Sequence, residues 1–385
     1  MRKLTRILSV CLACAAVLFL AACQQARQEE DLEFRIGLLE PVSTPLRFTG
    51  YRLAGARVDE LNAAGGLEVG GRKLKVRLIV VDSGGSTEQT MAGMTRLIQQ
   101  ERVSAIIGPY YSRDALPVAA ALETLRVPML SPSATNPAVT KGRSFAFRVC
   151  QVDSEQGQVL AATAYDDMKL RRAAVLFDES DAYSADLAGY FRTAFLARQG
   201  AQVLLEPYQG GAKDYGAQLA RIRAFGAQVL LLPNFPPDLV PQLQQARAAG
   251  YAGRFLGGDS WDADHGFHSL PEAQGALYDT DFAPAAADAK LLAAAQELSK
   301  RSGAALGKNT ALTLDALELL FAAARNVGST DPVSLRSGLA GLKNVEGLTG
   351  RVSYTGGGDP ERSVFIMEIS GGKALLRAHL QPTRK

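Results

Sequence analysis

The sequence predicts an α/β protein with two similar, doubly wound halves. From residue 34 onward short apolar runs alternate with amphipathic stretches, and a second cycle of the same kind follows residues 145–149. Some of the runs are continuously apolar, such as LIVV at residues 78–81 and AII at residues 105–107. Strands of a parallel sheet have this composition when helices cover both faces of the sheet. The alternation therefore predicts parallel sheets flanked by helices.

The first half is expected to run from residue 34 to about residue 150. Its predicted strands are residues 34–39, 74–82, 105–108, 127–130 and 145–149. Its predicted helices are a stretch ending near residue 62, followed by residues 87–102 and 112–125.

The second half repeats the pattern and then departs from it. Strands are predicted at residues 173–177, 203–205, 229–232 and 255–256, with helices at residues 184–199, 215–225 and 239–249. Gly250 directly follows the last of these helices, where a glycine suits the C-cap. After residue 281 the pattern predicts only helices, at residues 286–301, 309–326 and 332–342, and then a β-rich tail.

The N-terminus predicts export. Arg2, Lys3 and Arg6 precede an uncharged stretch at residues 7–22, which is shorter than the roughly 20 residues of a membrane-spanning helix. We interpret residues 1–22 as a signal peptide and residues 23–33 as a tether. LAAC at residues 20–23 resembles a bacterial lipobox, which implies that Cys23 is lipidated and that cleavage occurs before it. The alternative is an ordinary signal peptide, in which case Cys23 has no special role.

Composition excludes several classes of protein. Apolar residues make up 47% of the chain and charged residues 21%, which excludes a disordered, collagen-like or coiled-coil protein. The chain has 42 Lys and Arg against 39 Asp and Glu, and removal of the three basic residues in the signal leaves 39 against 39. A neutral chain without basic runs is not expected to bind nucleic acid.

The cysteines agree with this interpretation. Cys11 and Cys14 lie in the signal, so Cys150 is the one thiol expected after cleavage and lipidation, and a disulfide framework is not predicted. Cys150 ends the apolar run that begins at residue 145, so we expect a buried strand cysteine with no catalytic role.

An ordered series of motifs resembles the leucine/isoleucine/valine type of periplasmic solute-binding protein, in its lipoprotein form. The motifs are PVSTP at 41–45, NAAGG at 62–66, KLKV at 73–76, IIG at 106–108, SPSAT at 131–135, DSEQG at 153–157 and QQARAAG at 244–250. Each motif alone is weak, but their order along the chain is specific, and the resemblance covers residues 34–370.

The resemblance implies the type I fold of periplasmic binding proteins, with two lobes joined by three crossovers. The crossovers would lie near residues 150–153, 280–284 and 354–358. Lobe one would then comprise residues 34–150 and 283–355, and lobe two residues 151–282 and 356–385. Lobe one would be discontinuous in sequence, because the late helices return to it.

Hydroxyl groups are predicted where two strands of the first half end. Ser112 follows a strand at a predicted helix start, and Ser133 and Thr135 follow the next strand. Free amides and hydroxyls at such places favour a carboxylate, although Ser112 and Thr135 could instead be simple helix caps. The resemblance implies that these residues bind the carboxylate of an amino acid.

The resemblance also implies partners for the rest of an amino acid. Asp259 matches the acidic residue that binds the ligand ammonium, although branched-chain binders usually have the longer glutamate there. Tyr183 matches an aromatic residue of lobe two, and Phe235 replaces a tyrosine. Phe48 would line the side-chain pocket from lobe one, and Trp261 would narrow the pocket or stack on the ligand. Each of these aromatic residues could equally be a core residue.

Other chemistries have weaker support. The residues GDSWD at 258–262 nearly form a nucleophile elbow but have aspartate where the fifth residue must be glycine. A hydrolase would need Ser260 activated by His265 or His268. The donors Asp262, Asp264, His265 and His268 are close in sequence, but we interpret them as a loop and predict no metal and no cofactor.

The resemblance thus predicts a lipid-anchored binding protein outside the cytoplasm, not an enzyme. It would capture an amino acid, branched-chain or otherwise apolar, and deliver it to the membrane subunits of an ABC permease. It would act as a monomer and contact the membrane only through its lipid. The alternative is a receptor of the same fold that senses an amide or another small solute and signals to a partner protein.

Overall fold

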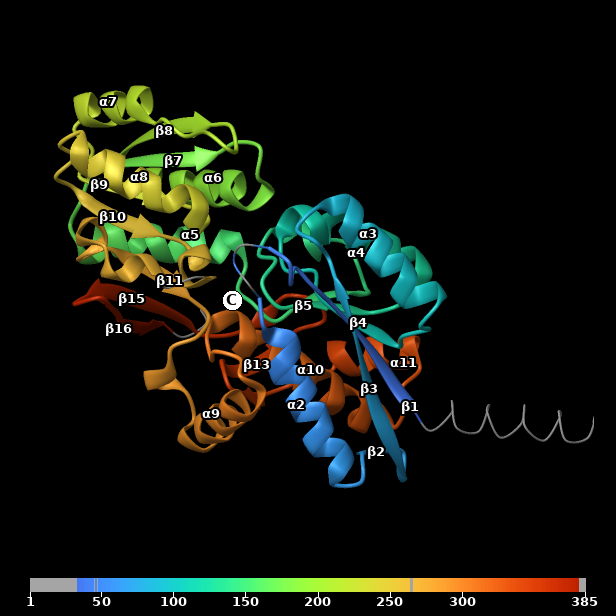
Figure 1. The fold of residues 1–385 in the computed structure, drawn as a ribbon. Helices are drawn as coiled ribbons and strands as arrows, with labels where there is room; N and C mark the ends of the chain where they lie inside the picture. Colours follow the sequence, from blue (N-terminus) through green and yellow to red (C-terminus); the bar gives the residue numbers. More distant parts are fainter. Residues whose placement is uncertain (1–32, 45, 47, 264–265, 381–385) are drawn as a thin grey trace, which may run out of the picture.

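The computed structural model describes residues 33–44, 46, 48–263 and 266–380, and the chain in this part forms two lobes (Figure 1). The signal peptide, Cys23 and all but the last residue of the tether lie outside the described residues. Each lobe is built on its own sheet, as the alternation of strands and helices predicts.

The sheet of lobe one has six strands in the order β2-β3-β1-β4-β5-β6. The strands are β1 (Glu33–Glu40), β2 (Leu67–Val69), β3 (Arg72–Asp82), β4 (Ala105–Ile107), β5 (Met129–Ser131) and β6 (Ala146–Arg148). All neighbours pair in parallel except β2 and β3, which form a hairpin. The chain runs from β1 to β3 on one side and then crosses to β4 on the other. The order of strands therefore reverses between β1 and β4, and ligands bind at such points in open α/β sheets.

The sheet of lobe two has seven strands in the order β16-β15-β11-β10-β9-β7-β8. The strands are β7 (Arg172–Asp178), β8 (Gln202–Tyr208), β9 (Val229–Leu232), β10 (Arg254–Gly257), β11 (Leu277–Thr280), β15 (Val364–Ser370) and β16 (Lys373–Leu380). The first five are parallel, and β15 and β16 are antiparallel additions at one edge. Here the order of strands reverses between β7 and β9.

Helices cover both faces of each sheet. In lobe one, α2 (Gly50–Ala63), α10 (Lys308–Val327) and α11 (Pro332–Ala340) pack on one face, and α3 (Thr87–Gln99) and α4 (Ser112–Leu125) on the other. In lobe two, α5 (Asp153–Ala162) and α6 (Ala182–Leu196) lie opposite α7 (Gly216–Phe225) and α8 (Pro236–Ala248). The fully buried Phe34, Ile36 and Leu38 of β1 anchor the core of lobe one.

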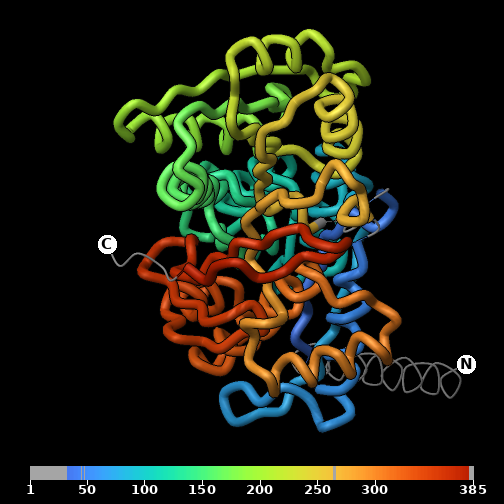
Figure 2. Tube along the Cα trace, turned by 90° about the vertical axis from the view of Figure 1, so that its left-hand side faces the viewer, coloured from blue at the N-terminus to red at the C-terminus, as the bar shows by residue number. Residues whose placement is uncertain are grey.

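The late helices return to lobe one. Helix α9 (Ala289–Ser302) and α10 pack beside α2, and Figure 2 shows the orange segment next to the blue N-terminal one. A small sheet of β12 (Val345–Gly347), β13 (Gly350–Tyr354) and β14 (Pro360–Glu361) follows. Residues 358–361 belong with lobe one, because Gly358 O accepts a hydrogen bond from Arg148 N and Glu361 pairs with Ser353. The third crossing therefore falls after Glu361, beyond the predicted residues 354–358.

Arg362 ties the three crossings together. Its guanidinium donates to the carbonyl oxygens of Val149 and Asp281, and it forms an ion pair of 3.2 Å with the Asp281 carboxylate. Val149 lies on the first crossing, Asp281 on the second and Arg362 itself on the third. Because both charged side chains are buried, this hinge is held by a desolvated ion pair.

Cys150 lies in the same hinge. It is fully buried, but β6 ends at Arg148, so it occupies a bend two residues beyond the strand in which we expected it. The chain turns there toward α5. Burial raises the pKa of the Cys150 thiol well above its usual value.

We expect native Cys150 to resist thiol reagents, because the nucleophile is the thiolate and the side chain is inaccessible. In a Cys23→Ser protein produced without its signal, a maleimide should label Cys150 in denaturant but not under native conditions. Native labelling as fast as that of a small free thiol would contradict the burial of this residue.

Candidate ligand-binding site

A small cavity lies between the lobes, where the loops from both reversal points meet. Lobe one contributes Phe48, Tyr110, Tyr111, Ser112, Ser133, Lys308 and Asn309, and lobe two contributes Tyr183, Phe235, Asp259 and Ser260. Its volume is about 20 Å³, which is room for about one water molecule. The lobes are therefore closed on each other, with side chains filling the cleft.

Aromatic side chains form the outer wall of this cavity. The Tyr111 and Phe235 rings meet edge to face across the cleft with centroids 5.4 Å apart, and both also line an outer pocket of about 440 Å³. Phe48 packs on Tyr111 at 5.8 Å, and Tyr183 packs on Phe235 at 5.5 Å. Tyr111 and Phe235 thus separate the small inner cavity from the mouth of the cleft.

Two of the predicted hydroxyl residues line the cavity. Ser112 is the first residue of α4, just after β4, and its Oγ accepts a hydrogen bond from Asn136 N at 3.2 Å. Ser133 follows β5, and its Oγ donates to Tyr110 O at 3.0 Å. Thr135 is buried beside them but does not line the cavity; its carbonyl oxygen accepts from Asp153 N at 3.0 Å.

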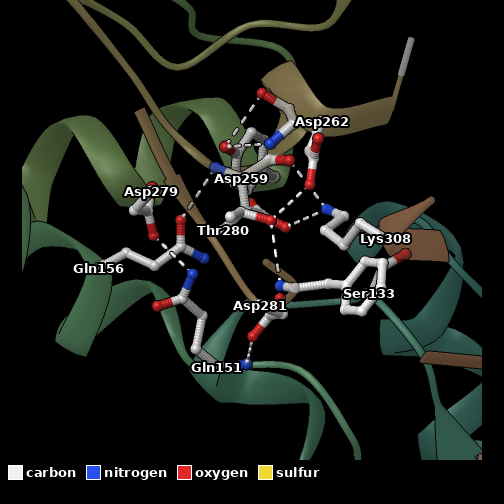
Figure 3. A network of polar contacts seen from close by, with 12 residues as sticks. Ser133, Gln151, Gln156, Asp259, Asp262, Asp279, Thr280, Asp281 and Lys308 are labelled. Atoms are coloured by element: carbon white, nitrogen blue, oxygen red, sulfur yellow. Dashed lines mark hydrogen bonds and ion pairs between the residues drawn. The ribbon is translucent and has the colours of Figure 1, made fainter. Parts of the chain in front are cut away.

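Asp259 lines the cavity and is paired with a lysine of the other lobe. Lys308 Nζ is 2.6 Å from Asp259 Oδ2 and 2.9 Å from Asp259 O, and both residues are only 3% exposed. Figure 3 shows the lysine pointing at the aspartate. Burial alone lowers the pKa of Lys308, but the Asp259 and Asp281 carboxylates outweigh it and the pKa lies above its usual value.

The sequence reasoning did not identify Lys308. One signal was available: it is the first residue of the 20-residue helix α10, and a cation is unfavourable at a helix N-terminus. Such a position suggests that the lysine is held there by a partner outside the helix.

A buried polar network backs Asp259 (Figure 3). Gln151 Nε2 donates to Asp279 Oδ2 at 2.5 Å, and Gln151 N donates to Asp281 Oδ1 at 2.9 Å. With its amide nitrogen turned toward the carboxylates, Gln156 donates to both Asp259 and Asp279 at 3.3 Å. Burial, and then the neighbouring Asp259, raise the pKa of Asp279 well above its usual value. Burial thus disfavours the charged form of Asp279, and among the residues that line the cavity Lys308 and Asp259 carry the charges.

Further contacts join the lobes at the rim of the cleft. Arg113 Nη1 is 3.2 Å from Asp181 Oδ2, and Asn136 Nδ2 donates to Asp186 Oδ2 at 2.6 Å. Arg113 and Asn136 belong to lobe one, and their partners flank or belong to α6 of lobe two. The closed arrangement is thus fastened both inside the cleft and at its edge.

Comparison with known proteins assigns the chain. The family model described as periplasmic binding protein matches residues 33–374. This protein belongs to that family. A Pseudomonas aeruginosa amino acid binding protein is 31% identical over 54% of this chain and 55% of that protein. A Leu/Ile/Val-binding protein homolog from Brucella melitensis is 26% identical over 89% of this chain and 93% of that protein.

Solved structures agree on the fold. The leucine-binding protein LivK of Thermotoga maritima superposes with a TM-score of 0.82 at 27% identity, covering 90% of this chain and 99% of that one. This protein accordingly has the type I fold of periplasmic binding proteins, as the motif series implies. The Brucella melitensis and Thermotoga maritima relatives are named for Leu/Ile/Val binding and for leucine binding.

The structure places Trp261 of this periplasmic binding protein away from the cavity. Trp261 is fully buried in lobe two, its Nε1 donates to Leu232 O at 2.8 Å, and its ring packs on Phe267 and Tyr278. The short 3-10 helix that begins at Asp259 turns the aspartate toward the cleft and the tryptophan into the core. Trp261 therefore supports the loop that carries Asp259.

The residues considered for hydrolysis and metal binding have other partners. Ser260 Oγ donates to Asn234 O at 2.9 Å, and a backbone carbonyl is not a general base. His268 packs against Phe267 in lobe two, and Asp262 accepts a hydrogen bond from Thr280 at 2.6 Å. His265 and Asp264 lie outside the described residues. In the described part of the chain no group of three metal-ligating side chains occurs.

Among the described residues, no helix has the length and apolar character that crossing a membrane requires.

Proposed function

We propose that this periplasmic binding protein captures an amino acid with an apolar, branched side chain between its lobes and delivers it, chemically unchanged, to an ABC permease. The observation that carries the proposal is the cleft itself. The reversal points of both sheets meet there, and hydroxyls, aromatic walls and a charged pair converge on one cavity. The relatives named for amino acid, leucine or Leu/Ile/Val binding support the same ligand class.

The parts of such a ligand have matching surroundings in the cleft. Ser112 and Ser133 lie at strand ends where a carboxylate is favoured, and Asp259 supplies a counter-charge for an ammonium group. Phe48, Tyr111 and Phe235 offer apolar surface for the side chain. Opening of the hinge admits the ligand, and the permease would recognise the closed form, which presents one surface built from two lobes.

Titration calorimetry of the wild-type protein with each of the twenty standard L-amino acids tests this function. We expect saturable binding of one molecule per chain, strongest for leucine, isoleucine or valine, because the walls are apolar. The protein should be purified by unfolding and refolding, so that any bound solute is removed first. Failure of all twenty amino acids to bind would overturn the proposal.

We also propose that a lipid on Cys23 anchors the protein to the membrane. In the Cys23→Ser variant, expressed with its full signal, lipidation should be lost and the protein should leave the membrane fraction. Cys150→Ser is the matched control, because it removes a thiol that is buried in the hinge. Equal membrane retention of Cys23→Ser and wild type would contradict the lipobox assignment.

A further inference from the structure

Lys308 and Asp259 form an ion pair in the small cavity, and this ion pair joins the two lobes directly. Lys308 comes from α10 of lobe one, and Asp259 follows β10 of lobe two. Both line the cavity, and its volume of about 20 Å³ excludes any amino acid while they touch. A ligand that occupies this cavity, and not the outer pocket of about 440 Å³, therefore needs more room, and separation of the pair provides it.

Separation leaves two groups in need of new partners. Once a ligand fills the cleft and the lobes close on it, the Lys308 ammonium lies on the wall of lobe one and the Asp259 carboxylate on the wall of lobe two. A desolvated charge without a counter-charge is strongly unfavourable, so the ligand must supply one charge of each sign. A zwitterion does this, whereas an anion leaves Asp259 unpaired and a cation leaves Lys308 unpaired.

We propose that Lys308 and Asp259 form a two-pole slot, into which the zwitterion of an amino acid inserts with its carboxylate on Lys308 and its ammonium on Asp259. The inference rests on the proposed function and adds Lys308 as a specificity-determining residue. In the empty protein the two poles bind each other, so the direct pair holds the cleft shut and competes with the ligand.

The surroundings of each pole fit this orientation. Lys308 is the first residue of α10 and Ser112 is the first residue of α4, so two helix N-termini and an ammonium line the cavity from lobe one. Asn309, beside Lys308, lines the cavity with a buried amide oxygen that accepts no hydrogen bond from the described residues. That oxygen is available to an N–H of the ligand.

The test compares three probes by calorimetry: the amino acid that wild type binds best, its 2-oxo acid, which lacks the ammonium, and its amine, which lacks the carboxylate. Wild type should bind each analogue at least 30-fold more weakly than the amino acid. Lys308→Met should lose discrimination against the amine, because no ammonium remains to be paired. Asp259→Asn should lose discrimination against the oxo acid for the converse reason.

Arg113→Met is the matched control, since it removes an ion pair between the lobes at the partly exposed rim of the cleft. It should keep the discrimination of wild type against both analogues. Small-angle scattering adds a readout without ligand: Lys308→Met should have a larger radius of gyration than wild type, and the increase in Arg113→Met should be smaller because that pair is partly exposed.

The outcomes separate the slot from the proposed function. If an amino acid binds but the oxo acid binds within threefold of it, the direct pair stays intact in the complex and the slot is overturned, while the proposed function stands. Unchanged discrimination in both Lys308→Met and Asp259→Asn overturns the slot in the same way. If no amino acid binds wild type, the proposed function fails and the slot fails with it.

Discussion

Arg362→Met is expected to lower the free energy of unfolding by about 3–5 kcal/mol, the usual cost of removing one partner of a buried ion pair. Arg362 is 2% exposed and Asp281 is fully buried, with 3.2 Å between the guanidinium Nε and the carboxylate. The substitution leaves the Asp281 carboxylate without the Arg362 charge. It also removes the hydrogen bonds that the guanidinium donates to the carbonyl oxygens of Val149 and Asp281 on the other two crossings. Equilibrium urea unfolding with circular dichroism measures the loss.

This destabilisation should depend on pH in a defined direction. Burial raises the pKa of the Asp281 carboxyl, and Arg362 opposes that rise. In Arg362→Met the larger of the two opposing charges is absent and only that of Lys308 remains, so the pKa in the folded state rises further above its unfolded value. The folded variant then binds a proton that the unfolded chain has lost, and its deficit relative to wild type should shrink from about pH 7 to about pH 5.

Two control variants test whether the loss of stability comes from the unpaired Asp281 carboxylate. Arg351→Met removes an arginine paired with Glu346 at the surface, where such pairs contribute about 0–1 kcal/mol. The double variant Arg362→Met, Asp281→Leu removes both charges and should recover part of the loss. An Arg362→Met protein as stable as Arg351→Met would show that the ion pair does not hold the hinge.

Asp259→Ala is expected to weaken binding of the amino-acid ligand by roughly 30-fold to several thousand-fold. Truncation of one side of a desolvated, hydrogen-bonded charge pair costs about 2–5 kcal/mol, and each 1.4 kcal/mol is about tenfold in affinity. Asp259→Asn keeps the size of the side chain and loses the charge, so it should also bind poorly. Calorimetry with the ligand identified from the twenty amino acids gives both values.

The same Asp259→Ala variant should lose little stability without ligand. Lys308 is left alone in a closed cleft, but Lys308 and Asp259 lie on different lobes, so opening of the hinge returns Lys308 to water. The loss in the free energy of unfolding should therefore stay within about 1 kcal/mol, as for an exposed pair. A variant that binds the ligand within about threefold of wild type would remove Asp259 from the site.

The contrast between the two ion pairs follows from their places in the fold. Arg362–Asp281 lies in the hinge, where both side chains are buried among the crossings, so its loss is expected to affect the folding of the whole chain. Lys308–Asp259 bridges the cleft, so the same kind of change acts mainly on binding and on the balance between open and closed forms.

The sequence alone predicts what depends on local pattern. The helix expected at residues 112–125 is α4 without a shift, and the strand expected at residues 229–232 is β9. Ser112 and Ser133 could be placed together because parallel strands end at a common edge of the sheet. Apolar periodicity and strand ends are properties of neighbouring residues, so one chain segment carries the whole signal.

Contacts between the lobes were decided only by the tertiary structure. Asp259 and Lys308 are 49 residues apart in different lobes, and no local pattern relates a loop carboxylate to a lysine at the start of a distant helix. Trp261 lies in the core for a similar reason, since the direction of each side chain in a 3-10 turn depends on how the turn packs on lobe two. The pairing of residues 358–361 with lobe one likewise depends on the edges offered by β6 and β13. Ion pairs and edge contacts of this kind form only where the two lobes lie against each other. How the lobes lie depends on the packing of both cores, which involves residues far apart in the sequence.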